Sequence, residues 1–96
     1  MIETATLTDF DADGRTPVFE DPYTVHLGLA AGDSVPAHTH PGQDVLFAVQ
    51  EGELELTVGD ATESLAAGEM ANFDGDADIA VEAIEDVRAL VVFADQ

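Results

Sequence analysis

Short apolar or alternating segments follow one another along this chain, and residues that favour turns separate them. The segment 53–58 is the clearest, because acidic residues alternate there with Leu54, Leu56 and Val58. Successive side chains of a β-strand point to opposite faces, so this segment has one face in water and one in a core. The other candidate strands are residues 24–30, 45–49, 62–65, 70–73, 79–84 and 89–94.

Turn residues between these segments limit each strand to a few residues. Gly59 and Asp60 follow the segment 53–58, and Ala67 and Gly68 precede the segment 70–73. No stretch has the period of a long amphipathic helix. The pattern therefore predicts an all-β fold of about seven or eight strands. Closure into a small barrel or a double sheet would protect the edge strands of such a fold.

The length and the hydrophobic content indicate one globular domain. The chain has 96 residues, which is enough for one modest core, and 46% of them are hydrophobic. A disordered acidic tail has fewer hydrophobic residues than this. The first residues are polar, so we expect residues 1–17 to form an N-terminal arm that is irregular or pairs with a strand. Residues 18–96 are then expected to form the barrel.

The charge is strongly negative. Asp and Glu number 21, whereas the only cations are Arg15 and Arg88, which gives a formal net charge of −19. This charge repels DNA, RNA and anionic membranes, so we expect none of them as partners. At molar salt the screening length falls to about 3 Å and the repulsion within the domain is largely removed. The composition resembles that of halophilic proteins that work at high salt, and an acidic protein from an ordinary cell is the alternative.

Three absences narrow the class of protein. The chain has no cysteine, which excludes both a disulfide framework and a thiolate metal site. No apolar run approaches the roughly 20 residues that span a bilayer. The N-terminus has neither the positive charge nor the long apolar segment of a secretory signal. We therefore expect a cytoplasmic location.

Two of the three histidines, His38 and His40, are separated by one residue. On a β-strand this spacing places both imidazoles on the same face. Two imidazoles that converge on one point form half of a site for Zn, Fe, Mn, Ni or Cu, which usually take three or four protein ligands. The alternative is a pair of partly buried histidines that form hydrogen bonds with the backbone or with water.

The stretch around these histidines resembles the first sequence motif of the cupin family. Five residues separate Gly32 from His38, four separate His40 from Val45, and six separate Val45 from Gly52, as in the family's G-x5-H-x-H-x4-E-x6-G pattern. The resemblance implies a small jelly-roll barrel, commonly dimeric, that holds one metal with three histidines and a glutamate. It covers roughly residues 24–94.

The chain departs from the family pattern at two of the four metal ligands. Val45 stands where the family has its glutamate. The second motif, G-x5-P-x-G-x2-H-x3-N, begins at Gly68, and without a gap its histidine falls on Ile79. Its proline then falls on Asp74 and its asparagine on Ala83. The resemblance therefore leaves only His38 and His40 as family ligands.

Other oxygen donors near the site could replace the missing ligands. Gln43 and Asp44 precede Val45, and a one-residue deletion in the second motif would place Asp78 at the histidine position. Alternation opposes that deletion, because Ile79 shares a face with apolar residues and Asp78 lies on the opposite face. The alternative for Gln43 and Asp44 is a solvated loop. His26, on the candidate strand 24–30, is expected to be exposed or capped.

The leading hypothesis is a small cupin that binds a small molecule, a weakly held divalent metal, or both. No cysteine nucleophile, strained serine turn or phosphate-binding glycine loop is present. Two alternatives are a metal-dependent enzyme of the isomerase or dioxygenase type and a non-catalytic structural or interaction subunit. We expect a homodimer and a cavity lined by His38, His40, Val45, Phe47, Phe73 and Ile79.

Overall fold

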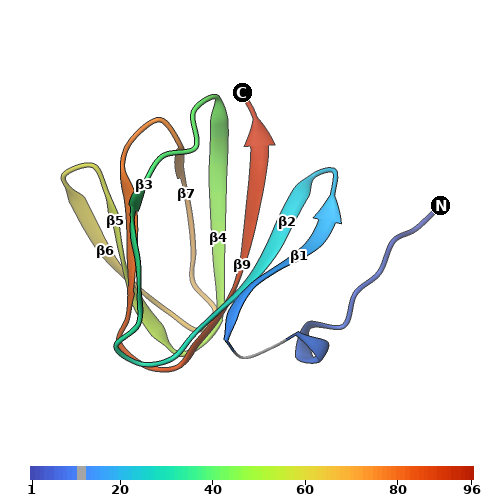
Figure 1. Cartoon of the computed structure of the whole chain (residues 1–96), viewed down its shortest axis with the longest axis horizontal. Helices are drawn as coiled ribbons and strands as arrows, with labels where there is room; N and C mark the ends of the chain where they lie inside the picture. The colour runs from blue at the N-terminus through green and yellow to red at the C-terminus, as the bar shows by residue number, and fades with distance from the viewer. Residues whose placement is uncertain (11–12) are drawn as a thin grey trace.

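The computed structural model describes residues 1–10 and 13–96, and within them nine strands and one short 3₁₀ helix, η1 (Leu7–Asp9). The strands are β1 (Gly14–Glu20), β2 (Tyr23–Leu29), β3 (Ser34–His38), β4 (Gln43–Glu51), β5 (Glu53–Val58), β6 (Ala61–Ala66), β7 (Met70–Asp74), β8 (Ile79–Ala83) and β9 (Val87–Asp95). The residues before η1 extend away from the sheets at the right of Figure 1. No helix among the described residues is long and apolar enough to cross a membrane.

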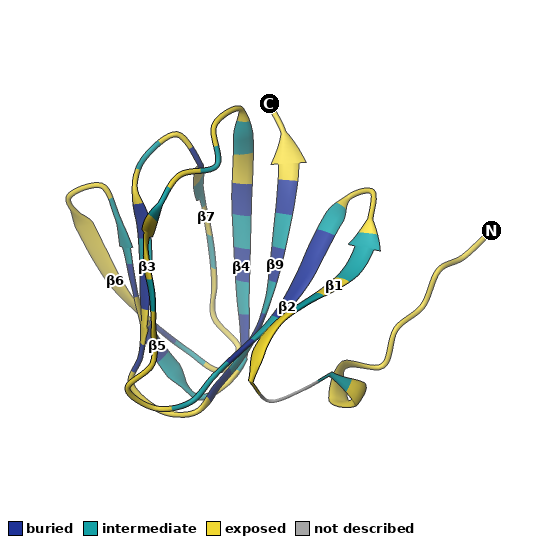
Figure 2. Ribbon diagram, viewed as in Figure 1, coloured by how far each residue is buried: buried dark blue, intermediate teal, exposed yellow. Residues whose placement is uncertain are grey.

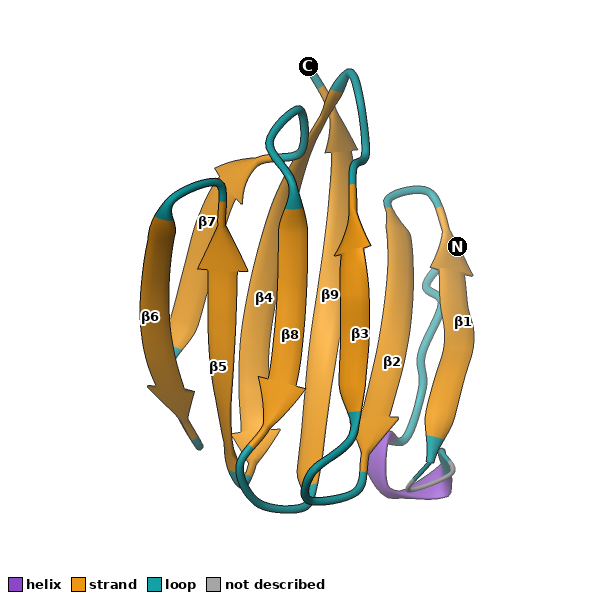
Figure 3. Cartoon of the chain, turned by 60° about the vertical axis from the view of Figure 1, so that its left-hand side comes forward, coloured by secondary structure: helices purple, strands orange, loops and turns teal. Residues whose placement is uncertain are grey.

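The strands form two antiparallel sheets that face each other. One sheet has the order β1-β2-β9-β4-β7, and the other has the order β3-β8-β5-β6. Figure 3 shows the two sheets as two layers. The long strands β4 and β9 pair side by side at the middle of the larger sheet. The structure thus confirms the predicted all-β jelly-roll fold in a single domain, with nine strands among the described residues where about seven or eight were predicted.

The core lies between the sheets and follows from strict alternation in the central strands. In β4, Val45, Phe47 and Val49 are buried while their neighbours are more exposed, and β9 repeats this pattern. Figure 2 shows the alternation as bands along β4 and β9. The buried hydrophobic residues are Val25, Val45, Phe47, Val49, Leu54, Leu56, Leu65, Ile79, Val81, Ala83, Val87, Ala89, Val91 and Phe93.

The edge strands β1 and β3 lack this alternation. Each contains a proline, and the pairing register shifts between Pro17 and Phe19 in β1 and between Val35 and His38 in β3. Proline cannot donate to a strand ladder and is tolerated mainly at sheet edges and bulges. β1 begins at Gly14, within the segment 1–17 that we expected to form an arm, and it pairs with β2.

Candidate functional site

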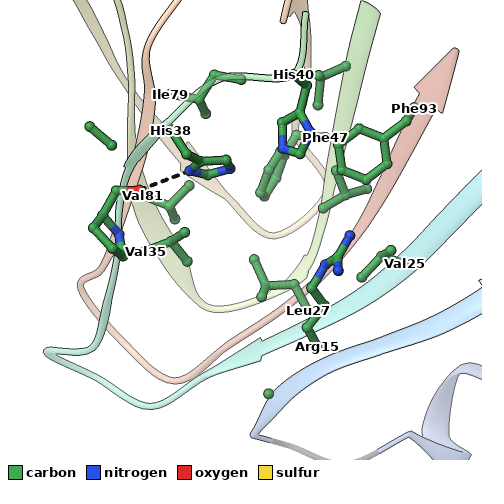
Figure 4. Close-up of a pocket in the computed structure, with 15 residues that line it drawn as sticks. Arg15, Val25, Leu27, Val35, His38, His40, Phe47, Ile79, Val81 and Phe93 are labelled. Atoms are coloured by element: carbon green, nitrogen blue, oxygen red, sulfur yellow. Dashed lines mark hydrogen bonds between the residues drawn. The ribbon is translucent and has the colours of Figure 1, made fainter. Parts of the chain in front are cut away.

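A pocket of about 540 Å³ lies between the two sheets, near their β1 and β3 edges. Its wall combines residues of β1, β2, β4 and β9 from the larger sheet with residues of β3 and β8 from the smaller one. Figure 4 shows side chains from both sheets directed toward one another across this space. The lining residues are Gly14, Arg15, Val25, Leu27, Val35, Pro36, Ala37, His38, His40, Val45, Phe47, Ile79, Val81, Val91 and Phe93.

A bulge in β3 directs His38 into the pocket. Val35 pairs with Val81 and His38 pairs with Ile79, so three steps along β3 match two steps along β8. The extra residue places His38 on the same face as Val35, where regular alternation would have put it on the opposite face. Both residues line the pocket.

A backbone hydrogen bond determines which nitrogen of His38 is free. Nδ1 of His38 lies 2.9 Å from the carbonyl oxygen of Pro36. A carbonyl oxygen can only accept, so Nδ1 carries the hydrogen and Nε2 keeps its lone pair when the ring is neutral. Histidines that bind metals commonly have their second ring nitrogen held in this way. His38 can therefore offer Nε2 to a ligand.

His40 follows the end of β3 and is positioned by the turn after β7. Its amide donates to the carbonyl of Gly75 at 2.7 Å, and its own carbonyl accepts from the amide of Gln43 at 3.2 Å. The ring of His40 meets that of His38 edge-on, with centroids 4.8 Å apart, and lies 4.6 Å from the ring of Phe93. The two imidazoles thus come together at one end of the pocket, although only His38 belongs to the strand.

The surroundings of His40 favour its neutral form. Burial lowers the pKa of His40, and the neighbouring His38 and Arg15 lower it further. Removing a cation from water is unfavourable, and a nearby positive charge adds to that cost. A neutral imidazole keeps one nitrogen lone pair, which can accept a hydrogen bond or bind a metal.

Of the four expected apolar lining residues, three line the pocket. Val45 and Ile79 are buried in its wall beside Phe47 and present no donor atom. Phe73 pairs with Val45 across the strands, but it lies on β7, the edge strand on the far side of β4 from β9. Phe73 therefore packs against the core outside the pocket.

The three oxygen donors considered as replacement ligands do not line the pocket. The side-chain amide of Gln43 donates to Asp95 at 3.4 Å, and Asp44 accepts from the side-chain amide of Gln96 at 3.1 Å. Asp78 is exposed. Within residues 1–10 and 13–96, no group of three or more histidine or carboxylate side chains is placed to hold a metal. The side chains present do not fit the four-ligand metal site that the cupin resemblance implies.

Arg15 is a lining residue that the sequence did not predict. It lies on β1, inside the segment expected to be an arm, and its guanidinium points into the pocket in Figure 4. One of its N–H groups donates to the hydroxyl of Tyr23 at 3.2 Å, and the guanidinium carbon lies 5.6 Å from the centre of that ring. The scarcity of cations, with only two arginines in the chain, was the one signal that could have pointed to it.

The third histidine, His26, lies on the opposite face of β2 from the pocket. It is completely buried, and Phe10 stacks on its ring with centroids 5.1 Å apart. The expectation that it is exposed or capped is therefore wrong, because Phe10 covers its ring. Neither ring nitrogen has a hydrogen-bond partner among the described residues.

Comparison with known proteins agrees with this architecture. The model of the cupin domain matches residues 25–93. TT1209 from Thermus thermophilus is 26% identical, with a TM-score of 0.87 and 98% of both chains covered. An RmlC-like cupin protein from Desulfovibrio desulfuricans is 25% identical, with a TM-score of 0.84 and coverage of 98% of this chain and 96% of that chain.

A more distant likeness shows the fold alone. The conserved protein SPY1581 from Streptococcus pyogenes, described as of unknown function, is 20% identical over 100% of this chain and 90% of its own, with a TM-score of 0.80. No protein with a curated description matches the chain. The cupin family model nevertheless spans most of the sequence, including His38, His40 and every residue of the pocket lining except Gly14 and Arg15. The chain belongs to the cupin domain family.

Proposed function

We propose that this protein binds a small, mainly apolar organic molecule in the pocket between its sheets. The observation that supports the proposal is the pocket itself, whose volume of about 540 Å³ suits a small organic ligand. All but three of its lining residues are glycine or carry apolar side chains. The exceptions are Arg15, His38 and His40, which provide a few polar contacts in an otherwise apolar wall.

The proposal includes weak binding of a divalent metal through His38 and His40. Two imidazoles are about half of the shell that such metals usually take from a protein, so water or the organic ligand would complete it. We expect brief chelation to remove any bound metal without lowering the melting temperature, and substitution His38→Ala to abolish the binding. A stoichiometric metal that survives dialysis against chelator would instead favour a metal-dependent enzyme.

A neutral fluorescent probe tests the organic site. N-phenyl-1-naphthylamine is apolar, uncharged and emits strongly only when removed from water. We expect saturable binding to the wild-type protein at one site per chain. The substitution Val35→Phe, which adds a ring to the pocket wall, should weaken binding by about tenfold or more, equivalent to about 1.4 kcal/mol.

The matched control places the same new ring outside the pocket. Ile84 is exposed and does not line the pocket, so Ile84→Phe should leave the affinity for the probe unchanged. Thermal melts of both variants show whether each remains folded. Non-saturable fluorescence, or equal binding by both folded variants, would refute the proposed pocket.

A further inference from the structure

The charges of the pocket contrast with those of the rest of the chain. Asp and Glu make up 21 of the 96 residues, yet none of the lining residues is acidic. Arg15, one of only two cations in the sequence, is a lining residue. The only formal charge on the pocket wall is therefore positive, inside a protein whose net charge is −19. We propose that the ligand is a small apolar monocarboxylate and that Arg15 holds its carboxylate.

Arg15 has donors available for such a ligand. A guanidinium carries five N–H donors, and the structure shows a side-chain bond from one nitrogen, to the hydroxyl of Tyr23. Arg88 provides a comparison, because it lies 3.6 Å from the carboxylate of Glu51 and donates to the carbonyl of Phe10. Arg15 forms no ion pair with any carboxylate of residues 1–10 or 13–96. Of the two arginines, the one that faces the pocket lacks a protein counter-ion in the part of the chain described.

Arg15 and the apolar residues beside it suit a ligand with one charged end and one apolar end. Arg15 is exposed on edge strand β1, at the open side of the pocket, and contact with Tyr23 holds its guanidinium there. Beside it, Val25 and Leu27 of β2 and Phe93 of β9 line the interior. A carboxylate on Arg15 would stay near water, while the apolar part of the ligand would be buried among these side chains.

One guanidinium suits one carboxylate. The planar N–H groups of arginine pair with the two oxygens of a carboxylate, which gives strength and orientation together. A second carboxylate on the ligand would lie in an apolar wall without a formal counter-charge, at a cost in desolvation. The net charge of the chain also opposes each additional negative charge. The contact with Arg15 favours a monoanion over a neutral molecule of the same shape, and the other two effects disfavour a dianion.

Two ligands that differ only in charge test the inference, which rests on the proposed apolar pocket. We would measure competition by 3-phenylpropanoate and by 3-phenylpropanamide against N-phenyl-1-naphthylamine at constant ionic strength. The wild-type protein should bind the carboxylate about tenfold more tightly than the amide. In Arg15→Gln this preference should fall below about twofold, with the amide affinity unchanged, because only the charged contact is lost.

The other arginine is the matched control. Arg88→Gln removes the same charge from a site outside the pocket lining, so it should retain the preference for the carboxylate. If wild type binds carboxylate and amide equally, the carboxylate inference fails while the pocket stands. If neither the probe nor either ligand binds, the proposed function itself fails. A preference lost equally in Arg15→Gln and Arg88→Gln would refute a specific role for Arg15.

Discussion

At the scale of single residues, His26 shows how completely this small domain can bury a titratable group. Its ring lies under Phe10, and neither nitrogen has a hydrogen-bond partner in the described part of the chain. Burial lowers the pKa of His26, the charge of Arg88 lowers it further, and Glu51 opposes the shift. The folded protein therefore holds this imidazole neutral at pH values where a free histidine would be charged.

The first prediction is that His26 makes the fold sensitive to mild acid. Free histidine titrates near pH 6.5, so as the pH falls through that value the unfolded chain takes up a proton before the folded chain does. The stabilisation from neutral His26 is complete above about pH 6.5 and is lost as the pH falls toward the lower pKa of the folded state. Thermal melts between about pH 7.5 and 5.5 measure this loss.

A variant that cannot titrate at position 26 separates the effect of His26 from the effect of the acidic surface. Protonation of carboxylates also changes the repulsion within the domain, but it does so equally in wild type and in His26→Leu. The wild type should therefore lose more stability than His26→Leu across the same pH range. Parallel curves for the two proteins would show that His26 has no such effect.

The second prediction concerns the carboxylate that the family motif has and this chain lacks. Val45 lines the same pocket as His38 and His40, and it is buried. Val45→Glu should raise the affinity for a divalent ion by about tenfold or more, because a carboxylate would join two imidazoles. Without metal the variant should be less stable than wild type, because a charge has been placed in an apolar wall. Zinc titration against a fluorescent chelator measures the affinity.

A carboxylate at another wall position is the control for this variant. Val91 also lines the pocket but stands on β9, at a position that the metal motif does not use. Val91→Glu should carry a similar cost in stability and gain no zinc affinity. Equal zinc affinity in the two variants would show that added charge alone, rather than its place beside the histidines, is responsible.

At the scale of elements, the position of His40 is set by the close approach of the backbone at Gly75 to the backbone of His40 and Gln43. The carbonyl of Gly75 accepts from the amide of His40 at 2.7 Å, and its amide donates to the carbonyl of Gln43 at 2.8 Å. A Cβ on Gly75 would lie only 2.5 Å from the carbonyl oxygen of His40 and 2.7 Å from that of Gln43. Only glycine fits between these two backbone oxygens.

The third prediction is that Gly75→Ala displaces the loop that carries His40. The new methyl group meets backbone rather than a flexible side chain, so the loop must shift and both hydrogen bonds weaken. We expect a loss of roughly 1–3 kcal/mol in stability, and altered NMR shifts for the His40 ring. Asp78→Ala, a change at an exposed position close by in the chain, should alter neither the stability nor the NMR shifts of the His40 ring. Unchanged His40 shifts in Gly75→Ala would contradict this account.

The sequence predicted those strands in which polar and apolar residues alternate or in which apolar residues form a continuous run. β5 was expected because acidic and apolar residues alternate along it, β9 was expected from its apolar run, and the spacing around His38 and His40 indicated the fold family. The sequence left open whether the segment before residue 18 is irregular or pairs with a strand, and the position of β1 was missed because Pro17 and a register shift interrupt its pattern. Arg15 was missed with it, since no local signal shows that a residue of an irregular segment will face a pocket. The outward strand position of His26 also gave no sign that Phe10, far along the chain, would cover it.

At the scale of the whole molecule, the negative net charge opposes the compact state. A net charge of −19 is carried by 96 residues, and the only ion pair among the described residues joins Arg88 to Glu51. Among residues 1–10 and 13–96, almost all the acidic side chains thus lack a positive partner. Their mutual repulsion opposes the compact state, and salt weakens it.

The fourth prediction is that stability rises steeply with salt. Between about 0.1 M and 1 M KCl the screening length falls from about 10 Å to about 3 Å, which removes most repulsion between surface carboxylates. The melting temperature should increase throughout this range. NaCl should act in the same way, because screening does not depend on the identity of the cation. A melting temperature that is flat or falls with added salt would contradict the charge argument.

The fifth prediction is a homodimer that forms at high salt. Alternation leaves Leu46, Leu90 and Val92 half-buried on the outer face of the larger sheet, opposite the core. Register pairs Leu46 with Val92 and Leu90 with His26, so Leu46, Leu90 and Val92 lie on one face of the sheet and form an apolar surface that a second copy could cover. Charge repulsion between two chains of −19 opposes association until salt screens it.

Light scattering in molar KCl should therefore report twice the chain mass of 10.1 kDa at micromolar concentration. Val92→Glu should return the protein to a single chain, because it places a charge in the middle of the covered surface. Ile84→Glu, at an exposed apolar position of the turn after β8, should leave the dimer intact. A mass of one chain for the wild type in molar salt would refute the dimer, and the outer apolar face would then need another explanation.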